Sequence, residues 1–175
     1  MKKVTIATIF AALMMISSAA FAQATANGTL NVTANVTGSI QLVFNTDTNG
    51  ITLSGDGTNA ATLAFGNVSA FGTLPAKVTR TVGTNNFTVT SAVDVLVSQV
   101  NSNSANYTLK AQLNAADATN TWTINNSGSL NTQQTLTATG TYGSKTNFPV
   151  SITIPFTSAS GTSISNTINY VASAN

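Results

Sequence analysis

The 175-residue sequence contains no cysteine, no histidine and no glutamate. Without imidazole and thiolate groups it cannot build the usual zinc clusters, a Ser-His-Asp triad or a Cys-His pair. Its only carboxylate side chains belong to Asp47, Asp56, Asp94 and Asp117, and none of these lies in a recognisable catalytic motif. The composition therefore predicts that the protein is not an enzyme and that it uses no cofactor and no metal.

The absence of cysteine also excludes disulfides. Small secreted domains often depend on disulfides because their cores are limited, so an exported chain of this length must be held by its apolar core and its sheet hydrogen bonds.

Charge is equally scarce, since only 6% of the residues are charged. The net charge of +2 comes from Lys2 and Lys3, because the other four basic residues balance the four aspartates. Nucleic acids and anionic membranes are bound by clustered Lys and Arg. The basic residues here are scattered, so neither partner is predicted.

The first 22 residues have the pattern of a bacterial secretory signal. Two lysines precede an apolar run, Ile6–Ile16, and Ala20-Phe21-Ala22 fits the small-x-small cleavage rule. The mature chain would then begin at Gln23, be secreted through the periplasm and contain no membrane span. A single membrane helix is the alternative, but the apolar run is short for a bilayer.

Thr, Asn and Ser supply most of the polar residues, and helix signals are poor, whereas short alternating segments separated by Gly and Asn recur about every ten residues. This pattern predicts an all-β chain with a single β-sandwich domain. The expected strands are Ser39–Phe44, Ile51–Leu53, Thr62–Phe65, Val78–Val82, Phe87–Thr90, Val93–Val100, Tyr107–Leu113, Trp122–Ile124, Thr135–Tyr142, Val150–Phe156 and Ile164–Val171. Asn49-Gly50 and Asn125–Gly128 are expected to form turns.

The stretch Gly28–Val36 alternates most regularly. Leu30, Val32, Ala34 and Val36 fall on one face, and Thr or Asn residues occupy the other. Just behind a cleaved signal, such a strand can begin its own sheet or pair with the edge of another molecule's sheet. We expect the second arrangement, with these four apolar residues buried in the neighbouring subunit.

Two weaker patterns suggest other ligands. The segments Asp47–Gly50 and Gly55–Gly57 resemble calcium loops, but both also fit ordinary turns, and the bidentate Glu of an EF-hand is missing. The aromatic residues could stack on a sugar, although in β proteins they more often belong to the core or to cross-strand pairs. The four aromatic residues with this pattern are Trp122, Tyr107, Tyr142 and Tyr170.

The run Leu-Asn-Val-Thr-Ala-Asn-Val-Thr-Gly-Ser-Ile at residues 30–40 resembles the mature N-terminus of the spore coat protein U family, which includes the major pilins of archaic chaperone-usher pili. Three further segments keep the family's order. Ala61–Gly66 resembles its Leu-x-Phe-Gly signature, Asn86–Thr90 its central strand, and Gly161–Tyr170 its final strand.

This resemblance implies an immunoglobulin-like sandwich that lacks one strand. A periplasmic chaperone would lend a strand during export, and an outer-membrane usher would assemble the subunits. Residues 23–36 would then donate the missing strand to the domain formed by residues 37–175 of a neighbouring copy. The resulting head-to-tail filament would be an extracellular pilus that serves adhesion or biofilm formation.

The sequence departs from the family at its usual disulfide. The resemblance places Ile40 and Ala92 where the two cysteines would stand, so that apolar packing would replace the bridge. Two alternatives to a pilin stay open. The protein could be a self-contained secreted sandwich that acts as a surface or coat protein, or a carbohydrate-binding adhesin.

Overall fold

The computed structural model describes residues 29–175, so the expected signal segment, residues 1–22, lies outside the described residues. The chain divides after Asn35 into two units, and every strand of the described residues belongs to the second unit, Val36–Asn175. Within the described range, no helix has the length and apolar character needed to cross a membrane.

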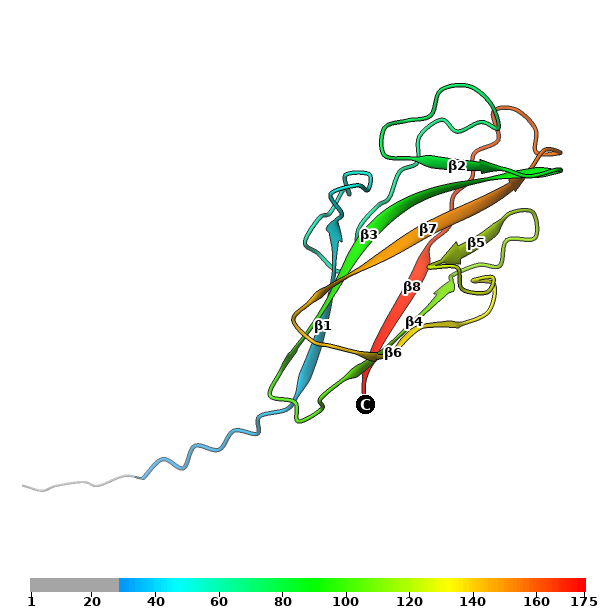
Figure 1. The fold of residues 1–175 in the computed structure, drawn as a ribbon. Coiled ribbons are helices and arrows are strands. Elements are labelled where there is room, and N and C mark those ends of the chain that lie inside the picture. Colours follow the sequence, from blue (N-terminus) through cyan, green and yellow to red (C-terminus); the bar gives the residue numbers. More distant parts are fainter. Residues whose placement is uncertain (1–28) are drawn as a thin grey trace, which may run out of the picture. The chain divides into compact units, whose positions relative to one another are not determined.

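The second unit is all-β, with two antiparallel sheets (Figure 1). The larger sheet has the order β1-β3-β7-β5, with β2 also paired to β3, and the smaller has the order β6-β4-β8. The expected all-β fold is confirmed, and the two sheets are consistent with a sandwich. The strands are β1 (Ser39–Thr46), β2 (Thr79–Val82), β3 (Asn86–Val100), β4 (Tyr107–Leu113), β5 (Thr121–Ile124), β6 (Gln134–Gly140), β7 (Lys145–Pro155) and β8 (Ile168–Ala174).

The core lies on the inner faces of β3, β4 and β7, where every second residue is buried. Val95, Val97 and Leu109 are completely buried. Their polar neighbours point outward, and on the outer face Thr88 and Thr153 join β3 to β7 through a hydroxyl hydrogen bond of 2.7 Å. Alternation in the sequence thus places one apolar face of each central strand against the other sheet.

Several expected strands differ from the structure. Phe87–Thr90 and Val93–Val100 are parts of one continuous strand, β3. Thr62–Phe65 forms no strand and makes only an isolated bridge between Ser54 and Thr62. The last strand begins at Ile168 and not at Ile164, because its partner β4 ends at Leu113, opposite Ile168.

The turn at Asn49-Gly50 is present, although the following Ile51–Leu53 segment is not a strand. The backbone N–H of Gly50 donates to the Asp47 carbonyl (3.1 Å). Glycine is required at this position because the backbone of Ala92 comes too close for a side chain. A Cβ at Gly50 would lie 2.0 Å from the carbonyl oxygen of Ala92. The other expected turn places Asn125 and Asn126 at positive φ, as a primed hairpin turn demands.

Candidate functional site: an apolar groove between two strand edges

A long groove runs along the second unit between β1, an edge strand of the larger sheet, and β8, an edge strand of the smaller one. Its volume is about 2090 Å³. The floor contains residues of the core, including Val89, Trp122 and Ile152. The groove therefore opens directly onto the interior of the sandwich.

The walls of the groove are apolar side chains that point inward without being fully covered. On one side these are Ile40, Leu42 and Phe44 of β1, and on the other Ile168 and Tyr170 of β8. All five pack against the core but stay only partly buried. The segments between the strands add further apolar contacts, from Leu63, Phe65, Val68, Ala70 and Ile164.

The edge of β1 that faces the groove is paired only at its far end. The backbone N–H of Phe44 donates to the Thr58 carbonyl (2.8 Å), and the Phe44 carbonyl accepts from Gly57 (2.7 Å). Successive residues of a strand turn their backbone groups to opposite edges. The backbone groups of Ile40 and Leu42 therefore also face the groove, and no described residue bonds to them there.

The facing edge of β8 is open along its length. Asn114 N–H donates to the Thr167 carbonyl (2.8 Å), and Asn175 N–H donates to the Asn106 carbonyl (3.1 Å), so odd-numbered residues of this strand bond to β4 and its flanks. The even-numbered residues from Ile168 to Ala174 turn their backbone groups the other way. Within the described part of the chain these groups have no strand partner.

The two edges approach each other through one aromatic contact. The rings of Phe44 and Tyr170 meet edge to face, with centroids 4.9 Å apart. Burial raises the pKa of the Tyr170 phenol well above its ordinary value. The hydroxyl is therefore held neutral, and this wall of the groove carries no charge at any ordinary pH.

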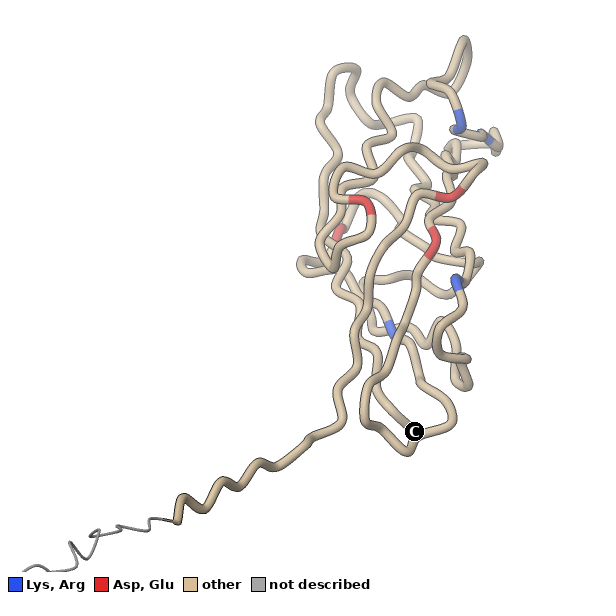
Figure 2. Tube along the Cα trace, turned by 90° about the vertical axis from the view of Figure 1, so that its left-hand side faces the viewer, with Lys and Arg blue, Asp and Glu red and all other residues tan. Residues whose placement is uncertain are grey.

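No Lys, Arg or Asp is found among the described residues that line the groove. Figure 2 shows that the charged residues of the domain are scattered along the chain and do not gather in one cluster. A neutral, apolar groove between two unpaired strand edges has the chemistry to accept an uncharged β-strand with one apolar face.

Of the predicted donor residues, Leu30, Val32 and Ala34 lie in the first unit, and Val36 begins the second. Residues 29–38 form no strand. The larger side chains are exposed, with 88% of Leu30, 78% of Val32 and 75% of Val36 accessible to solvent. Ala34 is exposed as well.

The suggested replacement of a disulfide by Ile40 and Ala92 is wrong. The strand register places Ile40 opposite Gln99, and Ala92 opposite Pro149 of β7. Positions 92 and 99 are seven steps apart on β3, which is roughly 23 Å along a strand. Ile40 also faces the interior, whereas Ala92 lies on the outer side of β3 between two buried neighbours. No disulfide could join these two positions.

The aromatic residues belong to the core, as expected. Trp122 and Tyr107 are buried. Tyr142 packs on Tyr107 with ring centroids 5.2 Å apart and donates its hydroxyl to the Asn106 carbonyl (3.1 Å). Buried rings leave no flat platform for a sugar at these positions.

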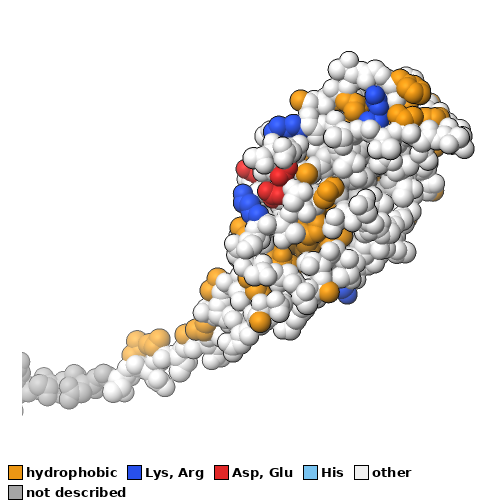
Figure 3. Space-filling view, in the orientation of Figure 1, with side chains coloured by type: hydrophobic (Ala, Val, Ile, Leu, Met, Phe, Trp, Pro, Cys, Tyr) orange, Lys and Arg blue, Asp and Glu red, His pale blue; other side chains and the backbone are white. Residues whose placement is uncertain are grey.

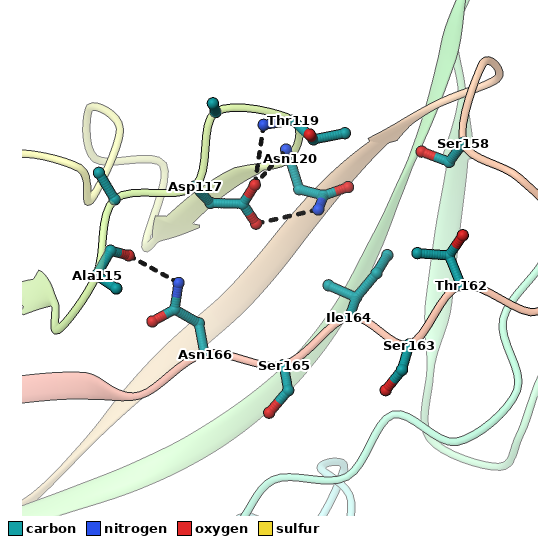
Figure 4. Close-up of a pocket in the computed structure, with 12 residues that line it drawn as sticks. Ala115, Asp117, Thr119, Asn120, Ser158, Thr162, Ser163, Ile164, Ser165 and Asn166 are labelled. Atoms are coloured by element: carbon teal, nitrogen blue, oxygen red, sulfur yellow. Dashed lines mark hydrogen bonds between the residues drawn. The ribbon is translucent and has the colours of Figure 1, made fainter.

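A smaller, polar pocket lies beside the β4–β5 loop, and Asp117 organises it (Figure 4). Its carboxylate accepts the backbone N–H groups of Thr119 (2.9 Å) and Asn120 (2.8 Å), and the indole N–H of Trp122 (2.7 Å). Burial alone would raise the pKa of Asp117, but these bonds and one from the Asn120 side chain outweigh it and lower the pKa to about 2. The carboxylate is fully engaged in holding the loop.

The aspartates of the two calcium-like loops also bond to backbone groups. Asp47 accepts the Asn49 N–H (2.8 Å), and Asp56 accepts the Thr46 N–H at the end of β1. Across residues 29–175 there is no group of three or more acidic, His or Cys residues that could hold a metal ion. Both loops therefore have the geometry of turns.

No family model, curated protein or solved structure matches the chain. The sequence did not identify Ile40, Leu42 and Ile168 as parts of one groove, because each of them looks like an ordinary inward-facing position of a strand. Finding the groove requires knowing which strands pair with each other, and the sequence alone does not give this pairing.

Proposed function

We propose that the protein is the structural subunit of an extracellular pilus, in which each copy fills the groove of a neighbour with its own Leu30–Val36 segment. The sandwich would then be immunoglobulin-like and incomplete in the single chain. The groove between β1 and β8 carries this proposal, because it combines an apolar floor with two edges that offer free backbone groups.

The donor segment matches the free edge of β8 in length. Leu30–Val36 and β8 each have seven residues, and seven extended residues span about 20 Å from the first Cα to the last. A strand laid along β8 would place its backbone opposite the free groups of Ile168, Tyr170 and Ala172. Its alternate apolar residues would enter the groove and cover the half-buried walls.

The exposure of the donor residues also supports this function. Large apolar side chains are costly to leave in water, and a solvated apolar strip commonly marks an interaction surface. Because the donated segment and the groove are different parts of one chain, the interaction is heterologous and propagates as an open filament. Export through the periplasm, a chaperone and an usher remain part of the proposal through the resemblance to pilins.

The experiment compares two single substitutions in the full chain, expressed with its export machinery. Val32→Asp places a charge on the apolar face, whereas Thr33→Asp places the same charge on the polar face. We expect electron microscopy to show thin fibres for the parent and for Thr33→Asp, and none for Val32→Asp, because an unpaired charge cannot enter an apolar groove.

Val32 is exposed in the single subunit, so its replacement leaves the fold intact and secreted monomer should accumulate. Fibres that persist with Val32→Asp, or after deletion of residues 23–36, would show that the segment is not the donor. A stable monomer of the parent chain, secreted without a chaperone, would favour the self-contained surface protein instead.

A further inference from the structure

The two strands that wall the groove run in opposite directions. β1 begins opposite the end of β3, and β8 ends opposite the start of β4, which follows β3 after a short loop. The start of β1 therefore lies at the same end of the domain as the end of β8. The rings of Phe44 and Tyr170, with centroids 4.9 Å apart, place these two residues level with each other across the groove.

The room between the two strands differs along the groove. Figure 3 shows hydrophobic side chains in the middle of the domain, between the places where Figure 1 labels β1 and β8. Because alternate residues of a strand share a face, the aromatic contact aligns three layers of facing residues. These layers are Phe44 with Tyr170, Leu42 with Ala172, and Ile40 with Ala174. In the first layer two rings touch, which leaves the least room, whereas in the other two a large side chain of β1 faces only an alanine.

The free edge of β8 limits the positions that a donated strand can take. The even-numbered residues turn their free backbone groups to this edge, and the side chains of Ile168, Tyr170 and Ala172 face the core. Residues directly opposite each other in a sheet point their side chains to the same face. The apolar donor residues must therefore lie opposite even-numbered residues of β8. All seven residues of Leu30–Val36 are then paired in only two ways, one antiparallel to β8 and one parallel to it.

Side-chain size distinguishes these two arrangements. In the antiparallel one the donor side chains become larger as the room increases, with Ala34 at the touching rings, Val32 at the second layer and Leu30 at the third. In the parallel one Val32 would meet the rings, and Ala34 would leave a void at the second layer. A shift of the antiparallel strand by two residues would put Val32 or Val36 on the rings and leave two donor residues beyond the end of β8. Overpacked and underfilled positions are both destabilising.

We infer that side-chain size sets the direction and register of the donated strand, and that Ala34 is the residue that specifies both. Ala34 of one copy lies against the Phe44 and Tyr170 rings of the next, and the strand runs antiparallel to β8 with Leu30 opposite Ala174. The slightly greater stability of antiparallel pairing favours the same direction. This inference rests on the proposed function and adds to it which residue of one copy meets which residue of the next.

Cysteine pairs on the outer face can test the register without entering the groove, because the chain has no native cysteine. The inferred register places Asn31 of the donor opposite Ser173 of the accepting copy, which is exposed. The Cα atoms of such a pair, which exchanges no hydrogen bonds, are about 4.5 Å apart and within reach of a disulfide. The full chain with Asn31→Cys and Ser173→Cys is assembled into fibres and oxidised. We expect a ladder of covalent oligomers on a non-reducing denaturing gel.

Two matched controls keep Asn31→Cys and move the second cysteine along the same exposed face of β8. Val171→Cys tests a register shifted by two residues, and Asn169→Cys tests the parallel direction. We expect both controls to run as monomers on the gel. A stronger ladder from either control would overturn the register, and fibres without a ladder from any pair would show that the donor does not lie on this edge. If the parent chain forms no fibres, the proposed function fails and the register fails with it.

An exchange of sizes within the donor tests the role of Ala34. The double variant Val32→Ala and Ala34→Val keeps the composition of the apolar face but puts a valine against the rings. Both positions are exposed in the single subunit, so the fold should not change. When the variant is mixed with an equal amount of parent subunit, we expect mass spectrometry of the fibres to find it at least about tenfold under-represented, because overpacking and a void both weaken the fit. Equal incorporation would show that Ala34 does not specify the register.

Discussion

The centre of the domain and its groove side are built from strands of the same kind, but they bury their apolar residues to very different degrees. On β3, β4 and β7 alternate residues are buried, with Val95 and Leu109 completely so. On β1 and β8 no residue is fully buried, although Ile40, Leu42 and Tyr170 face the same interior. Alternation decides which face of a strand points inward, whereas burial also requires a covering layer.

The comparison identifies what the groove side lacks. The central strands are covered by the opposite sheet and flanked by hydrogen-bonded neighbours, while β1 and β8 each have a neighbour on one edge only for most of their length. A single additional strand would supply both the missing cover and the missing backbone partners.

The largest effect is expected from truncating a core residue on the covered side. Leu109→Ala should lower the free energy of unfolding by about 2–5 kcal/mol, because it opens a cavity in a fully packed site. Leu42→Ala on the groove side should cost only roughly 1 kcal/mol, since that side chain is only partly buried. Urea unfolding of both variants measures the difference, in a Val32→Asp background that cannot donate its strand. Equal losses would show that the groove side is packed like the core.

A smaller effect is expected when the groove is filled within one chain. Residues 28–37 are copied after Asn175 through a short turn, again with Val32→Asp at the natural position. A strand antiparallel to β8 can follow it through a tight hairpin. The loss of unfolding free energy caused by Leu42→Ala should then rise from roughly 1 kcal/mol toward the lower end of the range of about 2–5 kcal/mol expected for a covered site, because the added strand covers Leu42.

The matched control carries the aspartate in the appended copy as well. In this control Leu42→Ala should still lower the free energy of unfolding by only roughly 1 kcal/mol. The readout is again urea unfolding. If the cost of Leu42→Ala is the same with the apolar and the charged copy, the appended segment does not occupy the groove.

The limits of the sequence are clearest at Ser91. Alternation predicted the bounds of Tyr107–Leu113, because each inward residue there is apolar, but it broke β3 in two at the polar Ser91. In the structure Ser91 is buried in the middle of the strand. Its hydroxyl donates to the Lys77 carbonyl and accepts the Ile51 N–H, both at 3.0 Å. These partners lie 14 and 40 residues away, so a local pattern could not reveal that the polar group is satisfied.

The groove could be predicted only in part for a similar reason. The apolar face of Leu30–Val36 is visible in the sequence, and so is the shared face of Ile164, Ile168 and Tyr170. Which strands become edges depends on the order of strands in the sheets, and that order is set by contacts between distant segments. The register of β1 on β3 is likewise a tertiary property, and it is where the expectation for Ile40 and Ala92 failed.

The smallest effect is expected at Asp117, which anchors Trp122 in the floor of the groove from the covered side. Asp117→Asn puts an amide where a carboxylate accepts the indole N–H, and should lower the free energy of unfolding by about 1 kcal/mol at neutral pH, a modest value because the site is partly solvated.

The pH dependence gives the sharper test at this residue. The pKa of Asp117 falls from an ordinary 3.8 to about 2 on folding. The carboxylate therefore contributes its full stability above pH 4, and the contribution is lost as the pH falls from about 4 to 2. Unfolding midpoints of the parent and Asp117→Asn, measured over this range, should converge at the acid end. The two midpoints should converge equally with and without the appended strand, because the hydrogen bond from Trp122 to Asp117 lies outside the open edges of β1 and β8. A difference between the two midpoints that stays constant down to pH 2 would contradict this role of Asp117.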